Sequence, residues 1–413
     1  MINIVFVHDH MKIGGAEKAL LNMIYALDHQ KFKIYLLLFK TEGDYMDLLP
    51  PDVEVHRLTS ESLSQCYKRG GIFSCIKGLV IRVLLRATIH DYSLNSILTG
   101  QLCRFPANVP CDVLIAFSHL CFTLSWVSRQ KIKQKILFIH QAKFNVNYEK
   151  LLQKDIHRFK KIVCVSDAAK QYMDTRFFPF ASKTVVIHSL LGPGRIKALS
   201  EYPMDIQMNH FSILTVARLT EEKGCQFIPW IAQRILSYGL QVYWYVIGDG
   251  ELYKDIVSII QKMSLQKNVI LLGAKVNPYP FIKMCDIYVQ PSVHEGYGLS
   301  LQEARILCKP IVATDIPAFK ELIDSGVNGT LAELYSPSFF ENKLNRPSDH
   351  GHIQETDCQD VYIHDFADAI MDLIRNQEKR NSYSEWLRNH PIETDSKEIL
   401  KLDELFCEIA EKK

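Results

Sequence analysis

Residues 286–315 read DIYVQPSVHEGYGLSLQEARILCKPIVATD and carry the clearest fold signal in the chain. A β-branched run ends at Ser292, a turn with Gly296 and Gly298 follows, then comes a segment of helical period, and a second β-branched run begins at Pro310. Two parallel strands need a crossover connection, which is usually a helix. This stretch therefore predicts a strand, a helix and a second strand of one parallel sheet.

Apolar runs of the same kind recur along the chain and alternate with segments of helical period. Those in the first half are residues 2–8, 33–39, 112–118, 135–141, 161–166 and 184–189. A second series follows Pro203, at residues 211–218, 242–250, 269–274, 286–292 and 310–315. Because 413 residues exceed what one compact core normally holds, we expect two Rossmann-like, doubly wound α/β domains that face each other across a cleft.

Domain limits follow from breaks in this pattern. The stretch from Ser189 to Asn209 contains Gly and Pro residues and is the expected linker. We accordingly assign residues 1–190 to an N-terminal domain, 191–385 to a C-terminal domain, and 386–413 to a helix that packs back on the N-terminal domain. Residues 335–362 turn polar and are expected to form a surface insertion.

The composition excludes several classes of protein. With 47% hydrophobic and 23% charged residues, the chain is an ordinary globular one. Its most apolar stretch, residues 71–89, contains Lys77, Arg82 and Arg86, so no transmembrane helix is expected. The start, MINIVFVHDH, lacks the basic region and cleavage site of a signal peptide, which indicates a cytoplasmic protein. Eleven cysteines without a CxxC pair indicate reduced thiols, mostly in the core.

The net charge of +2 hides a polarity between the two halves. Residues 1–185 carry 25 Lys+Arg and 15 Asp+Glu, net +10, and the remainder carries 23 and 31, net −8. Residues 62–90 combine five cations and no acid with apolar residues, as a helix lying on an anionic membrane surface would. A core helix whose cations reach solvent is the alternative. We expect the N-terminal half to attract anionic partners and no nucleic acid partner.

Two strand-to-helix turns carry glycines or cations, and open α/β sheets bind ligands at such turns. At the first, Gly14 and Gly15 begin a helix whose free N–H groups could face an anion, although a glycine turn chosen for its backbone angles explains them equally well. At the second, VARLTEEKG places Arg218 and Lys223 beyond a strand, where both could reach a phosphate. Solvated surface cations are the alternative.

The turn in residues 286–315 is the richest in candidate groups. Glu295 stands beside Gly296 and Gly298, and Glu303 follows eight residues after Glu295. The glycines allow close approach of a ligand, and the start of the helix offers unpaired N–H groups. Glycosidase carboxylates lie roughly 5–10 Å apart, whereas eight helical residues span roughly 12 Å. The spacing therefore better suits two contacts on one long ligand, and two carboxylates on a helix surface are the alternative.

Histidines are less informative than these carboxylates. His140 ends a strand of the N-terminal domain and is placed to face the cleft, whereas His294 could be an incidental neighbour of Glu295. HDH at residues 8–10 and DHGH at residues 349–352 resemble metal-ligand clusters only superficially. We expect no metal centre.

Four motifs together resemble those of the group 1 (family four) retaining glycosyltransferases, from the N-terminus to about Gly329. They are GGAEK at 14–18, VARLTEEKG at 216–224, NPYPFIKMCDIYVQPSVHEGYGLSLQEA at 277–304, and KPIVATDIPAFKELIDSGVNG at 309–329. The resemblance implies the GT-B fold, with the acceptor bound mainly by the N-terminal domain and the nucleotide-sugar donor by the C-terminal domain. The chain departs from the family pattern at Ser189, where Asn is common, and at Cys308, where Gly is common.

The resemblance also implies a role for each candidate residue. Arg218 and Lys223 would bind the donor diphosphate, and Glu303 would accept hydrogen bonds from the ribose hydroxyls. Glu295 would hold hydroxyls of the transferred sugar, and His140 would lie beside that sugar. The implied catalytic residues are thus Glu295, His140, Arg218 and Lys223. Backbone groups at the remaining positions would contact the sugar or the phosphates, namely Gly15, Gly296, Tyr297, Gly298 and Leu299.

The expected reaction is transfer of a hexose or N-acetylhexosamine from a nucleotide diphosphate sugar to a lipid-linked glycan in bacterial surface polysaccharide synthesis, and we expect the nucleotide to be UDP. Two fixed cations and helix N-termini stabilise a leaving nucleoside diphosphate, so no cofactor and no metal ion are required. The basic N-terminal domain would keep the protein at the inner face of the plasma membrane. Two alternatives stay open: a nucleotide-sugar epimerase or phosphorylase of the same fold, and an inactive donor-binding partner subunit.

Overall fold

The chain forms two compact α/β units. The structure, a computed structural model, describes residues 1–58, 72, 76–77, 79–80, 103–118, 121–144, 146–204, 206–208, 211–333, 363–392 and 394–411. The N-terminal unit consists of Met1–Leu190 and Ser396–Lys413, and the C-terminal unit is Leu191–Asp395.

The described part of the N-terminal unit contains a seven-stranded parallel sheet in the order β3-β2-β1-β4-β5-β6-β7. Its strands are β1 (Ile2–His8), β2 (Phe32–Leu38), β3 (Glu54–Arg57), β4 (Val113–Ala116), β5 (Lys135–Ile139), β6 (Lys161–Cys164) and β7 (Thr184–Val186). In the register of the central strands, Val5 pairs with Tyr35 on one side and with Leu114 on the other. The central strands β1, β2 and β4 are mostly apolar and buried, as expected where helices cover both faces of a parallel sheet.

Helices of the N-terminal unit pack on the two faces of this sheet. They are α1 (Gly15–Ala26), α4 (Cys121–Arg129), α5 (Val146–Asp155), α6 (Asp167–Arg176) and α16 (Ser396–Glu411), with 3-10 segments η1 (Met46–Leu48), η2 (Ile156–Arg158) and η3 (Phe178–Lys183). α4, α5 and α6 share one core cluster with Val5 and Val7. On the other face, the Phe406 ring of α16 lies 6.4 Å from that of Phe6 and 5.9 Å from that of Phe32. The last helix therefore completes the core of the N-terminal unit.

The C-terminal unit contains a six-stranded parallel sheet in the order β10-β9-β8-β11-β12-β13. Its strands are β8 (Ser212–Val216), β9 (Tyr243–Ile247), β10 (Val269–Leu271), β11 (Ile287–Gln290), β12 (Ile311–Thr314) and β13 (Thr330–Ala332). Its helices are α7 (Pro193–Leu199), α8 (Ile228–Ser237), α9 (Tyr253–Lys262), α10 (Tyr279–Met284), α11 (Leu299–Ile306), α12 (Pro317–Lys320), α14 (Ile363–Arg375) and α15 (Gln377–Asn389), with 3-10 segments η4 (Glu221–Lys223) and η5 (Cys225–Phe227).

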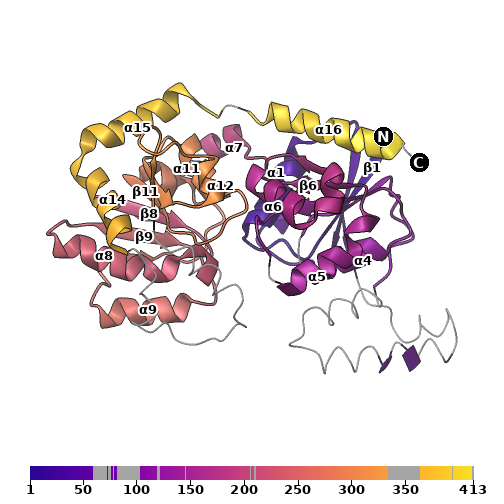
Figure 1. The fold of residues 1–413 in the computed structure, drawn as a ribbon, viewed down its shortest axis with the longest axis horizontal. Helices are drawn as coiled ribbons and strands as arrows, with labels where there is room; N and C mark the ends of the chain where they lie inside the picture. Colours follow the sequence, from indigo (N-terminus) through magenta and orange to yellow (C-terminus); the bar gives the residue numbers. More distant parts are fainter. Residues whose placement is uncertain are drawn as a thin grey trace. The chain divides into compact units, whose positions relative to one another are not determined.

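Adjacent residues of β9 separate two groups of helices in this unit. Trp244 and Val246 share a core cluster with α8, α9 and α14, whereas Tyr245 and Ile247 share another with α7, α10, α11 and α12. Neighbouring residues of a strand point to opposite faces of the sheet, so the two groups cover opposite faces (Figure 1). The expected doubly wound architecture is thus present in both units.

The structure differs from the expected domain limits at one place. The first division lies between Leu190 and Leu191, as assigned from the sequence. The expected limit between residues 385 and 386 falls inside α15, and the chain re-enters the N-terminal unit only at Ser396. The whole of α15 belongs to the C-terminal unit because its Tyr383 is fully buried in the core cluster that contains residues of α14. The insertion at 335–362 and most of residues 62–90 lie outside the described residues.

Other sequence expectations can be compared with the described residues. No helix among them is long and apolar enough to cross a membrane. The described cysteines are free thiols, and Cys103, Cys164, Cys225 and Cys285 are buried. Cys308 has a φ of 54°, in the left-handed region that favours glycine. This backbone angle explains why glycine is common at this position in the family that the chain resembles.

Candidate active site

Each sheet has one point at which the strand order reverses, and ligands of open α/β sheets bind there, outside the carboxyl ends of the strands. In the C-terminal unit, this point lies between β8 and β11. Arg218 and Lys223 follow β8, and Glu295 follows β11. Three of the expected donor-site residues thus come from the two turns at this switch point.

The turn that carries Arg218 packs tightly against the turn after β9. A Cβ atom on Gly248 would lie 1.8 Å from the carbonyl oxygen of Ala217, and one on Gly250 would lie 2.5 Å from that of Leu219. Neither position admits a side chain, so both glycines are needed for the path of the backbone around Arg218. The Arg218 side chain is exposed.

Lys223 and Glu295 connect the two turns of the switch point. Lys223 Nζ lies 2.7 Å from Glu295 Oε2, and the two side chains are 16% and 11% exposed. The carbonyl oxygen of Glu222 accepts hydrogen bonds from the N–H groups of Val293 (2.8 Å) and His294 (3.2 Å). The ion pair and the two backbone bonds hold the turns in a fixed arrangement.

A chain of buried hydrogen bonds leads from β11 to the other carboxylate oxygen of Glu295. Tyr288 OH donates to Gln290 Oε1 (2.7 Å), Gln290 Nε2 donates to Ser292 Oγ (2.8 Å), and Ser292 Oγ donates to Glu295 Oε1 (2.9 Å). All three donor side chains are at most 1% exposed. Hydrogen bonds in a buried chain strengthen one another, and here every donor points toward the carboxylate. Glu295 is therefore held at both oxygens.

The start of α11 presents backbone N–H groups next to Glu295. Gly298 precedes the first helical residue, Leu299, with a φ of 73°. A Cβ atom on Gly298 would lie 2.7 Å from Phe319 Cε1. Gly298 makes no side-chain cap, and the N–H groups of a first helical turn have no acceptor within the helix. Tyr297 OH accepts a hydrogen bond from Gln302 Nε2 (3.0 Å), which fixes the loop before the helix.

Glu303 and Gly296 are buried parts of the same segment. Glu303 is 2% exposed within α11. Glu295, at 11%, is also largely covered. The burial of Glu295 and Glu303 therefore excludes the alternative that both carboxylates lie on an exposed helix surface.

Gly15 and His140 belong to the N-terminal unit, whose switch point lies between β1 and β4. Gly15 begins α1, and His140 follows β5. The His140 ring centroid lies 4.6 Å from that of Phe117. At the switch point itself, Ser118 Oγ donates to Asp9 Oδ2 (2.7 Å). Burial raises the pKa of Asp9, against the opposing effects of His8 and Ser118.

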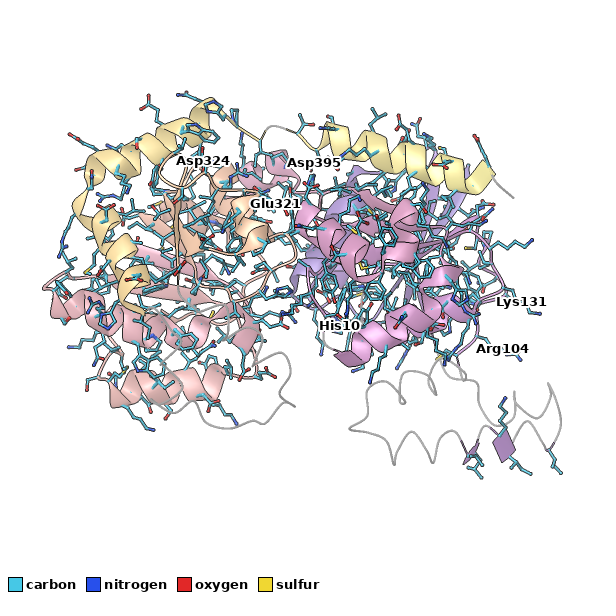
Figure 2. The ribbon with its side chains drawn as sticks, viewed as in Figure 1. His10, Arg104, Lys131, Glu321, Asp324 and Asp395 are labelled. Carbon is cyan, nitrogen blue, oxygen red and sulfur yellow. The ribbon has the colours of Figure 1, made fainter. Side chains whose placement is uncertain are left out.

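A carboxylate already occupies the N-terminus of α1, where the sequence predicts an anion site. Glu17 Oε1 lies 3.2 Å from His8 Nε2 and 3.5 Å from His10 Nδ1. A Cβ atom on Gly14 would lie 2.2 Å from Glu17 Oε2, so this carboxylate folds back over Gly14. Burial favours a higher pKa for Glu17, but the hydrogen bond and charge of His8 and the charge of His10 outweigh it and lower the pKa to about 2. His10 lies at the rim of the unit (Figure 2).

Two groups of site residues were not identified from the sequence. Tyr288 and Gln290 of β11 and Ser292, two residues beyond it, follow a period of two, which is a usable sequence signal for a shared face. Glu17 stands two residues after Gly15, where an acid reaches back to the helix start, and this spacing is a usable sequence signal.

The chain is similar in sequence to known glycosyltransferases. The family model described as "Glycosyl transferases group 1" matches residues 204–354. The chain is 24% identical to an Escherichia coli UDP-Gal:alpha-D-GlcNAc-diphosphoundecaprenol alpha-1,3-galactosyltransferase over 87% of this chain and 93% of that protein. It is 26% identical to the E. coli O-antigen biosynthesis glycosyltransferase WclY, over 57% of this chain and 63% of that protein.

A solved structure extends the likeness to the whole fold. A mutant of S. aureus TarM, crystallised with Fondaparinux, alpha-GlcNAc-glycerol and UDP, matches with a TM-score of 0.70 and 13% identity. The match covers 98% of this chain and 100% of that one. Together with the two doubly wound units, it shows the GT-B fold.

Proposed function

We propose that this chain, which has the GT-B fold, is a group 1 glycosyltransferase that transfers a hexose or N-acetylhexosamine from a UDP-sugar to a lipid-linked glycan. The observation that carries the proposal is the pair of joined turns in the C-terminal unit. They hold Lys223 against Glu295 and place the exposed Arg218 on the same switch point.

The donor fits the chemistry of these residues. Arg218 and Lys223 offer the positive charge that a diphosphate needs, and the start of α11 adds N–H groups and a favourable dipole. Glu303 is a buried carboxylate, and ribose hydroxyls are hydrogen-bond donors that suit it. Glu295, held at both oxygens, keeps lone pairs for the hydroxyls of the sugar.

In this proposal, the reaction retains the configuration of the sugar and needs no metal ion. The bond between the anomeric carbon and the diphosphate breaks, and its electron pair stays on the leaving phosphate. The acceptor oxygen forms the new bond on the same face, while the departing phosphate takes its proton. Arg218, Lys223 and the α11 N-terminus stabilise the charge that develops on the phosphate, which is the part a metal ion would otherwise play.

The acceptor is proposed from the relatives. The galactosyltransferase of E. coli is named for an acceptor linked through diphosphate to undecaprenol, and WclY for O-antigen biosynthesis. We extend this to a lipid-diphosphate glycan destined for a bacterial surface polysaccharide. His140, which follows β5, would lie beside the reacting sugar.

A basic N-terminal half suits a protein that works on a lipid carrier at a membrane surface. Within the stretch 62–90, the structure describes four apolar residues with helical backbone, Ile72, Ile76, Leu79 and Val80. Their exposed fractions are 64%, 54%, 52% and 49%, in that order. Their exposure supports peripheral contact with an anionic membrane and disfavours a buried core helix. Flotation with vesicles containing anionic lipid tests this, and I76D/L79D should lose binding that the unaltered protein shows.

The donor site is tested by thermal shift and calorimetry with UDP, GDP, ADP and their sugars, with and without EDTA. We expect stabilisation by UDP that EDTA leaves unchanged and that R218A/K223A abolishes. The matched control is K254A/K262A, which removes two exposed cations of α9 in the same unit and should bind UDP normally.

Transfer is tested with a synthetic GlcNAc-diphosphate lipid and with lipid-linked glycan fractions from bacterial membranes. Release of UDP coupled to a labelled lipid product, with the anomeric configuration of the donor, is the expected result. A protein that binds no nucleotide diphosphate, or that modifies none of these acceptors, would contradict the proposal.

A further inference from the structure

Glu17 is a carboxylate that the donor chemistry does not use. It lies in α1 at the switch point of the N-terminal unit, beyond the end of β1. Its side chain is 14% exposed and that of His10 is 29% exposed, whereas His8, at 1%, lies behind them. Asp9 is 8% exposed and receives the Ser118 hydroxyl. Glu17 and His10 are thus the members of this cluster that a ligand can reach.

We infer that Glu17, with His10 beside it, binds a hydroxyl group of the sugar acceptor. The inference rests on the proposed function and names a residue contact within it. A carboxylate accepts hydrogen bonds at about four lone-pair positions, and the neighbouring histidines occupy positions on Oε1 only. A sugar hydroxyl donates to such an acceptor and carries no charge.

A phosphate group is the wrong ligand for this position. The N-terminus of α1 would attract an anion, but the Glu17 carboxylate already covers Gly14 there. Its depressed pKa keeps Glu17 ionised at neutral pH. A diphosphate brought to Gly15 would meet this negative charge at close range, whereas a hydroxyl would gain a charge-assisted hydrogen bond.

A buried nitrogen atom of this cluster has no hydrogen-bond partner among the described residues, which is a further reason to assign the cluster a function. His8 Nδ1 is buried without a hydrogen-bond partner among the described residues, while His8 Nε2 faces Glu17. Leaving a buried polar atom unpaired costs free energy, and native proteins rarely do so without a functional reason. Among the described residues, His8 therefore has its hydrogen-bond contact at Nε2, with the Glu17 carboxylate.

The test compares Glu17→Gln with Glu42→Gln, a control that neutralises an exposed carboxylate paired with Lys12 in the same unit. The measurements are the KM for the lipid-linked glycan that the unaltered protein modifies, the Kd for UDP, and the affinity for inorganic phosphate. We expect E17Q to raise the acceptor KM about tenfold, with the UDP Kd unchanged and the control unaffected.

A second variant, His10→Gln, serves as the test if E17Q fails to fold. His10 lies at the rim of the unit with its side chain 29% exposed, so its substitution should leave the fold intact. It should raise the same KM by a smaller factor. An acceptor KM within twofold of the unaltered protein in the folded variants overturns the inference. Tighter binding of UDP or phosphate to E17Q also overturns it, because the position would then be an anion site. Failure of the unaltered protein to bind UDP or transfer sugar defeats the proposed function instead, and the inference falls with it.

Discussion

Glu295 and Glu17 both lie at the switch point of their unit, Glu295 in the turn after β11 and Glu17 in the helix after β1, and their partners differ. Glu295 lies beside Lys223 and receives the Ser292 hydroxyl, whereas Glu17 lies between His8 and His10. The comparison teaches that one fold can hold a carboxylate by a lysine and a hydroxyl in one unit and by two histidines in the other.

Neutralising Glu295 should have the largest effect. Glu295→Gln keeps the shape but weakens the hydrogen bonds to the sugar and leaves Lys223 without its partner, so we expect kcat to fall about 100-fold. The UDP Kd should stay nearly constant, because the carboxylate contacts the sugar rather than the nucleotide. Glu201→Gln is the control, since Glu201 pairs with Lys283 at 2.6 Å on the surface, where the two side chains are 68% and 42% exposed. A larger change in UDP affinity than in kcat would show that Glu295 serves the nucleotide.

The Glu17 carboxylate, held by His8 and His10, should couple the stability of the protein to acid. The folded pKa of Glu17, about 2, lies below its ordinary value of 4.5. This depressed pKa stabilises the fold above about pH 4.5, and the stabilisation is lost as the pH falls toward 2. The shift corresponds to about 3 kcal/mol. Urea unfolding between pH 5 and pH 2.5 should show a steep loss in the unaltered protein and a shallower one in E17Q. Parallel curves would mean that His8 and His10 do not hold this carboxylate in its charged form.

Removing the hydroxyl behind Glu295 should have the smallest effect of the three. Ser292→Ala deletes the donor to Oε1 and leaves Gln290 Nε2 without its acceptor, so we expect kcat to fall about tenfold. Ser292→Thr, which keeps a hydroxyl, should recover most of it. UDP binding should be unchanged in both, because Lys223 still holds Oε2. Ser237→Ala, which removes an exposed hydroxyl bonded only to its own helix, is the control. A KM effect without a kcat effect would contradict a positioning role.

Local patterns in the sequence were sufficient to predict the fold. The continuous apolar runs predicted buried parallel strands, and helical segments between them predicted the crossovers, because each signal depends on neighbours in the chain. The turns at Gly298 and after β8 were found for the same reason, and Arg218, Lys223, Glu295 and Glu303 were identified as candidates from them. The misplaced domain limit at 385 shows where this fails, since burial of Tyr383 depends on packing against α14.

Only the tertiary structure decided which candidate groups meet. Lys223 and Glu295 lie on different strand-to-helix turns, and their ion pair exists because β8 and β11 are neighbours in the sheet. Gly248 is required because the turns after β8 and β9 come into backbone contact, which no local pattern encodes. The sequence by itself determined two doubly wound units and the turns that carry chemistry, because strands, helices and turns are local. The charge partners of Glu295 and Glu17 were decided by strand order and helix packing, because those bring together residues that the sequence keeps apart.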